Sequence, residues 1–148
     1  MTETDRTEDL ARAMEQAKAQ YESIVEMVKA LKATTEEEDG RDNDVAREAA
    51  EQAIQEDPLS VQVRSGWYSP GAAKDDIARR PAEYEILLCT GGPAARIVGK
   101  LNDYDEPETA EIECQDWFTP WTRWNSGDVE SAERILLAYA RCFYFGEG

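Results

Sequence analysis

The chain has 148 residues, of which 32 are acidic and 16 basic, so its net charge is −16, and it contains no histidine. This balance disfavours direct contact with nucleic acid or anionic membranes, and the lack of histidine removes most zinc sites. No run of about 18 apolar residues occurs, and the polar start lacks the basic and apolar stretches of a secretory signal. We therefore expect a cytoplasmic protein.

The first third of the sequence is predicted to be a long helix. No Gly or Pro interrupts Thr7 to Ala33, and apolar residues recur there at spacings of three and four. The stripe is longer than most helices of globular proteins, which indicates either a helical hairpin or a coiled-coil homodimer. Its members are Leu10, Met14, Ala17, Tyr21, Ile24, Val28 and Leu31.

An acidic loop and a second helix follow. Glu36 to Asp39 form an unbroken acidic run, and a shorter helix is predicted over about Val45 to Gln55. Pro58 ends that helix, and the apolar period then changes from about four to two. We therefore divide the chain into a helical region, residues 1–58, and an α+β sheet domain, residues 59–148.

Alternating apolar residues predict four strands in the second region. The loops between the second, third and fourth strands are too short for crossover helices, so antiparallel pairing is favoured. A last helix, capped by Ser126 or Asp128 and reaching about Phe145, can cover the apolar face of the sheet. The predicted fold is α+β, with a helical pair, a four-stranded antiparallel sheet and a closing helix. The strands cover about Leu59 to Arg64, Glu83 to Thr90, Ala95 to Leu101 and Ala110 to Trp117.

Little in the sequence favours catalysis. Acid–base chemistry near neutral pH usually uses histidine, which is missing. Cys89, Cys114 and Cys142 are widely spaced and predict buried free thiols rather than metal ligands. The pair Gly91-Gly92 belongs to no phosphate-binding motif. We expect a non-enzymatic protein with no catalytic residue, no metal and no cofactor.

The most distinctive charge feature is the stretch Leu101 to Asp116, which holds seven acidic residues and no Lys or Arg. Its charge spacing coarsely approaches that of a nucleic-acid backbone, so the stretch could occupy a basic groove. A simpler interpretation covers two of the acids: Glu111 and Glu113 pair with Arg96 and Lys100 across the third and fourth strands. That pairing leaves the loop acids unexplained.

An aromatic segment follows the acidic stretch. Trp117, Phe118, Trp121 and Trp124 lie within eight residues. One interpretation is that these rings fix the loop to the sheet edge and the last helix, and the other is a protein interface hot spot. The candidate partner-binding residues are therefore Asp103, Asp105, Glu106, Glu108, Glu111, Glu113, Asp116, Trp117, Trp121 and Trp124.

Four segments carry a resemblance to a known group of proteins. They are VQVRSGW at residues 61–67, EYEILLCTGGPA at 83–94, QDWFTPW at 115–121 and LAYARCFYFG at 137–146. The segments resemble small acidic proteins of bacteriophages and plasmids, over about 85 residues. The resemblance implies a mobile-element origin and, by analogy, an inhibitor of bacterial defence such as an anti-CRISPR or anti-restriction protein. It carries over no catalytic residue.

Two functional hypotheses follow. In the first, the chain is an anti-CRISPR-like inhibitor that mimics nucleic-acid charge and binds a nucleic-acid-binding defence protein, such as a CRISPR effector, in the bacterial cytoplasm. In the second, it is a non-enzymatic homodimeric assembly protein that uses the stripe from Leu10 to Leu31, and its acidity only confers solubility.

Overall fold

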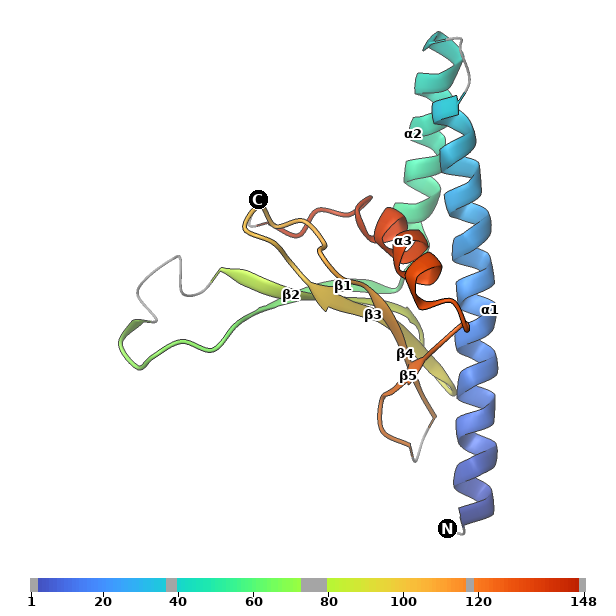
Figure 1. The fold of residues 1–148 in the computed structure, drawn as a ribbon, viewed down its shortest axis with the longest axis vertical. Helices are drawn as coiled ribbons and strands as arrows, with labels where there is room; N and C mark the ends of the chain where they lie inside the picture. The colour runs from blue at the N-terminus through green and yellow to red at the C-terminus, as the bar shows by residue number, and fades with distance from the viewer. Residues whose placement is uncertain (1–2, 37–39, 73–79, 117–118, 147–148) are drawn as a thin grey trace.

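The computed structural model describes residues 3–36, 40–72, 80–116 and 119–146. In these ranges three helices accompany one antiparallel sheet, which is the α+β architecture that the sequence predicted (Figure 1). The helices are α1 (Glu3–Glu36), α2 (Gly40–Glu56) and α3 (Val129–Ala140). The strands lie in sequence order across the sheet and are β1 (Ser60–Ser65), β2 (Pro81–Cys89), β3 (Ala94–Lys100), β4 (Glu111–Gln115) and β5 (Thr122–Trp124).

The helix α1 forms one side of the molecule, with α2 beside its C-terminal half and the sheet projecting from it (Figure 1). Its apolar stripe points into the core, where Ala17, Ile24 and Val28 are buried. The N-terminal half of α1 lies against β4, and Met14 Sδ is 3.7 Å from Cys114 Sγ. None of the helices in the described ranges is both long and apolar enough to span a bilayer.

The two faces of the sheet have opposite character. One row of side chains runs across all five strands on the face toward α1 and α3, because antiparallel partners point to the same side. That row is Val61, Ile86, Ile97, Ile112 and Trp124, and its three isoleucines are buried. The opposite face, which we call the open face, carries charged residues and has no helix over it among the described elements (Figure 1).

The sheet has one strand more than the four that were predicted. β5 is only three residues long and follows Pro120 within the aromatic segment. Its sequence is too short to show an alternating pattern, so its identity depends on pairing with β4. The pairing sets Trp124 beside Ile112 and places its ring 5.2 Å from that of Tyr21 on α1.

The helix α3 begins where the sequence predicted and ends earlier. The Asp128 side chain caps it by accepting a hydrogen bond from the Ser131 backbone N–H. The helix stops at Ala140 rather than near Phe145, because the chain turns back toward the sheet. This turn buries Phe145, whose ring centroid lies 4.9 Å from that of Tyr84.

Residues 1–58 and 59–148 share one hydrophobic core, to which α1, the sheet and α3 all contribute. Polar contacts also join the two regions near the end of α2. The Tyr139 hydroxyl donates a hydrogen bond of 2.8 Å to Asp57, and the Gln55 side-chain amide donates to the Cys142 carbonyl. The helical region therefore packs directly on the sheet domain.

Candidate functional site

The structure divides the acidic stretch Leu101–Asp116 into a strand part and a loop part. In the strand part, Glu113 accepts two hydrogen bonds from Arg96, as the sequence predicted. Glu111 pairs with Arg123 on β5 at 3.0 Å instead of Lys100. The register explains this difference, because Val98 stands opposite Glu111 on β3.

Asp116 is a structural residue at the end of the acidic stretch. Its side chain is only 2% exposed, and Arg12 Nε on α1 lies 3.3 Å from its carboxylate. Arg12 also bonds to Asp9 one turn earlier, so a single guanidinium holds two buried acids. Asp116 therefore does not contribute to an exposed acidic surface.

The loop part of the stretch keeps its acids at the surface. Asp103, Glu106 and Glu108 are exposed and form no ion pair within the described part of the chain. Asp105 differs, because it is half-buried and pairs with Arg80 at 3.4 Å. Three of the seven acids thus remain available to a partner.

The backbone of this loop is well fixed. A bridge between Leu101 and Pro107 closes it, and the Asn102 side chain accepts hydrogen bonds from the backbone N–H groups of Tyr104 and Glu106. The Arg141 guanidinium, just after α3, also donates to the Pro107 carbonyl. The loop acids are therefore presented on a preformed scaffold, which limits the ordering entropy that binding must overcome.

The aromatic residues that the sequence singled out lie in different places. Trp121 lies under Arg96, whose guanidinium carbon is 4.1 Å from the ring centroid. Trp124 and Tyr21 are both half-buried and pack on each other against the core. Trp117, like its neighbour Phe118, lies outside the described residues. The structure thus does not gather Trp121 and Trp124 with the exposed loop acids.

Two exposed tyrosines that the sequence prediction missed flank the loop acids. Tyr104 is 82% exposed at the tip of the loop, and Tyr144 is 74% exposed in the segment after α3. The segment and the loop are adjacent, because a Cβ at Gly146 would lie 2.6 Å from the Tyr144 hydroxyl and 3.2 Å from Asp105 Oδ2. We call this set the acidic–tyrosine surface; its members are Asp103, Tyr104, Glu106, Glu108 and Tyr144.

Sequence signals for these tyrosines existed but were weak. Tyr104 stands between two aspartates in a loop with no apolar neighbour, which is an unusual setting for a ring that packs in a core. Tyr144 lies in the apolar run at residues 142–145, where nothing distinguishes it from its buried neighbour Phe145. The turn after α3 is what leaves the Tyr144 ring exposed and the Phe145 ring buried.

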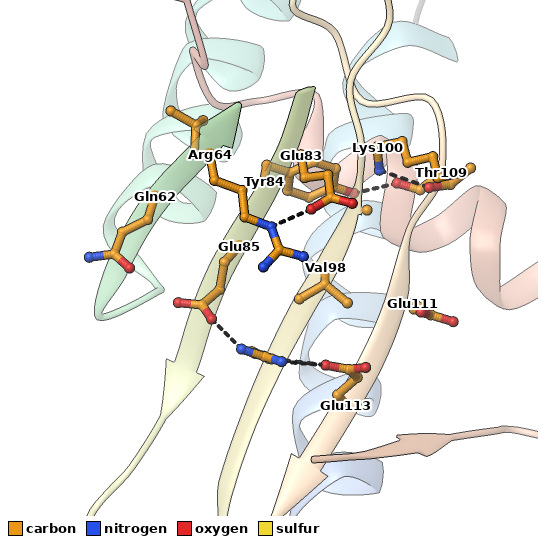
Figure 2. Close-up of a pocket in the computed structure, with 13 residues that line it drawn as sticks. Gln62, Arg64, Glu83, Tyr84, Glu85, Val98, Lys100, Thr109, Glu111 and Glu113 are labelled. Carbon is orange, nitrogen blue, oxygen red and sulfur yellow. Dashed lines mark hydrogen bonds and ion pairs between the residues drawn. The ribbon is translucent and has the colours of Figure 1, made fainter. Parts of the chain in front are cut away.

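The open face of the sheet is a second candidate region (Figure 2). It contains a hollow of about 480 Å³ in which acidic and basic side chains alternate. Arg96 bonds to Glu85 at 2.6 Å and to Glu113 at 2.7 Å, and Arg64 bonds to Glu83. Although the chain is strongly acidic, this face carries nearly balanced charge.

The three cysteines are free, and two of them are poor nucleophiles. Burial, followed by the nearby Glu51 carboxylate, raises the pKa of Cys142 to about 11. Burial and the Glu113 carboxylate also raise the pKa of Cys114. Thiolates are the reactive form, so the arrangement keeps both groups protonated near neutral pH. Within the described ranges, no group of three potential ligand side chains is placed to hold a metal ion.

Comparison with known proteins gives this chain no family. No protein-family model matches it, and no curated protein or solved structure is significantly similar. The resemblance to small proteins of phages and plasmids therefore remains a prediction from the sequence segments. The acidic–tyrosine surface and the open face are therefore the two candidate regions for binding a partner or a ligand.

Proposed function

We propose that the chain is a non-enzymatic binding protein that docks its acidic–tyrosine surface on a basic surface of another protein. One observation supports this proposal most directly. Asp103, Glu106 and Glu108 are exposed on a loop whose backbone is fixed, and they form no ion pair in the described structure. The other four acids of the stretch are bonded to arginines. The acidic–tyrosine surface therefore uses only three of the seven acids of the stretch Leu101–Asp116.

The chemistry of this surface suits a protein partner. Exposed tyrosines bury large area at low entropic cost and are enriched at interface hot spots. Carboxylates around them would pair with Lys or Arg of the partner and set its orientation. Tyr104 and Tyr144 supply the rings, and Asp103, Glu106 and Glu108 supply the charge.

Charge elsewhere in the chain supports fast capture of a basic partner. Residues 36–57 contain ten acidic and two basic residues, a net charge of −8, which is half of the total of −16. The end of α2 lies next to the segment after α3, as the bond from Gln55 to the Cys142 carbonyl shows. The resulting field would attract a basic surface toward the acidic–tyrosine surface.

The partner class follows from charge and from the sequence resemblance. Extended basic surfaces in cells belong mainly to nucleic-acid-binding proteins. The phage-like and plasmid-like segments favour a bacterial defence protein, such as a CRISPR effector, whose nucleic-acid site the chain would block. We propose an anti-CRISPR-like inhibitor that acts by charge mimicry.

The homodimer alternative has less support from the packing. Ala17, Ile24 and Val28 of the apolar stripe are buried inside the chain. Only half-buried members such as Leu10 and Met14 could reach a second copy without opening the fold. Light scattering at tens of micromolar separates the two proposals, and we expect a monomer.

Affinity capture from bacterial lysate tests the proposal. The probe variant combines Asp103→Asn, Glu106→Gln and Glu108→Gln, and the control combines Glu8→Gln, Glu15→Gln and Glu22→Gln on α1, which changes the net charge equally. We expect wild type and control to capture a nucleic-acid-binding protein that raised salt releases. Equal capture by the probe variant would refute the proposal.

A further inference from the structure

A groove on the open face of the sheet has no role in the proposed function. The hollow of about 480 Å³ adjoins a second hollow of about 530 Å³, because Arg64, Glu83 and Lys100 line both. Figure 2 shows these side chains at one end of the first hollow, with Val98 between the glutamates of β2 and β4. Trp67 also lines the second hollow.

The charges in this groove leave basic donors unused. Glu83 is bonded to Arg64, while Glu85 and Glu113 are bonded to Arg96. Lys100, in contrast, forms no ion pair in the parts of the chain that the structure describes. Among the described residues Arg64 bonds only to Glu83, through its Nε, so its two terminal nitrogens can still donate.

Trp67 gives the same groove an aromatic platform. Its indole is fully exposed, although Trp is usually highly buried. It lies in the hollow with Arg64 and Lys100, two residues that can bind an anion. An exposed ring beside free cationic donors is the arrangement that stacks a flat ligand and holds its charged group.

We propose that this groove binds a nucleoside monophosphate, with its base on Trp67 and its phosphate at Lys100 and Arg64. A phosphate matches the donors of an ammonium and a guanidinium. Each of the two hollows, at about 480 Å³ and about 530 Å³, lies within the range of small-ligand sites. A longer nucleic acid fits poorly, because each further phosphate meets the field of a chain with net charge −16.

The test is a titration of the full chain with adenosine 5′-monophosphate, followed by the indole N–H signals in NMR. We expect a saturable shift of the Trp67 signal. Lys100→Gln, and Trp67→Ala followed by calorimetry because its own signal is lost, should each weaken binding about tenfold or more, as loss of a charged contact or of a stacking ring does. The control Lys18→Gln, which removes an equal charge from exposed α1 surface, should bind like wild type.

Three further ligands complete the test. Adenosine alone and inorganic phosphate alone should each bind about tenfold more weakly than the monophosphate, and a 5′-phosphorylated tetranucleotide should not bind more tightly. The proposal fails if Trp67 shows no saturable shift, or if Lys100→Gln and Lys18→Gln behave alike. Tighter binding of the tetranucleotide would contradict a mononucleotide site. This result is independent of capture by the acidic–tyrosine surface.

Discussion

Arg12 on α1 and Asp116 at the end of β4 are 104 positions apart in the sequence, yet Arg12 Nε lies 3.3 Å from the Asp116 carboxylate. Asp116 is buried, while Arg12 reaches it from a partly exposed position. The contact fastens the N-terminal half of the long helix to the sheet edge. It also explains why one acid of a basic-free stretch has no role on the surface.

Removing this guanidinium should destabilise the fold. Arg12→Gln removes the Arg12 guanidinium from the buried Asp116 carboxylate, so we expect the free energy of unfolding to fall by about 1–3 kcal/mol. Urea unfolding measures the change. The control Lys18→Gln breaks an exposed pair with Glu22 and should cost less than about 1 kcal/mol. Equal losses in the two variants would contradict a structural role for Arg12.

Gly99 is required by the close passage of the loop over β3. A Cβ at this position would lie 1.9 Å from the Thr109 carbonyl oxygen and 2.7 Å from the Tyr84 ring. Gly99→Ala should therefore lower the free energy of unfolding by about 2 kcal/mol or more. Gly92→Ala is the matched control, because apart from its chain neighbours no residue has an atom within 4 Å of the new methyl group. Thermal unfolding of both proteins decides the point, and a fully stable Gly99→Ala protein would contradict this packing.

Stability should fall at alkaline pH, partly through Cys142. Burial and Glu51 raise its pKa in the folded chain to about 11 from an ordinary 9.0, so folding favours the protonated thiol. The contribution of the Cys142 thiol to the free energy of unfolding is complete below pH 9.0. It is lost as the pH rises through about 11, because the unfolded chain releases the proton at lower pH than the folded chain. Burial also raises the pKa values of Tyr139 and Tyr84, which extends the loss to higher pH.

Urea midpoints measured between about pH 8 and 11 test the cysteine contribution. Cys142→Ser removes the titrating group, so its midpoint should decline less steeply than that of wild type over this range. Glu51→Gln should also reduce the decline, since the Glu51 charge contributes to the raised pKa. An unchanged slope in Cys142→Ser would assign the decline to other groups.

Periodic parts of the sequence predicted the fold well. Ile86, Ile97 and Ile112 each lie in an alternating run, and the structure places all three in one buried row. The signal is local, because alternation reports which face of a strand is buried. The strand β5 was not predicted, because three residues are too few to show an alternating apolar pattern. Only its pairing with β4 defines it as a strand.

The candidate site was predicted less completely, because pairing of charges depends on tertiary placement. The sequence predicted that Glu111 pairs with a basic residue of the third strand and that Asp116 belongs to the acidic surface, but Arg123 and Arg12 reach them from other elements. Tyr144 is exposed because α3 ends at Ala140 and the chain turns, which local propensity does not reveal. The sequence did predict that the loop acids are exposed, because the loop that holds Asp103, Glu106 and Glu108 has few apolar side chains that could be buried.

The most direct test of charge-guided binding is the association rate with the captured partner, measured against salt concentration. Replacing Asp103, Glu106 and Glu108 by their amides should slow association about tenfold at low salt and flatten its salt dependence. The control with Glu8, Glu15 and Glu22 as glutamines should stay close to wild type, because it changes the same charge away from the acidic–tyrosine surface. Association rates that match between the two triple variants at every salt concentration would contradict the account.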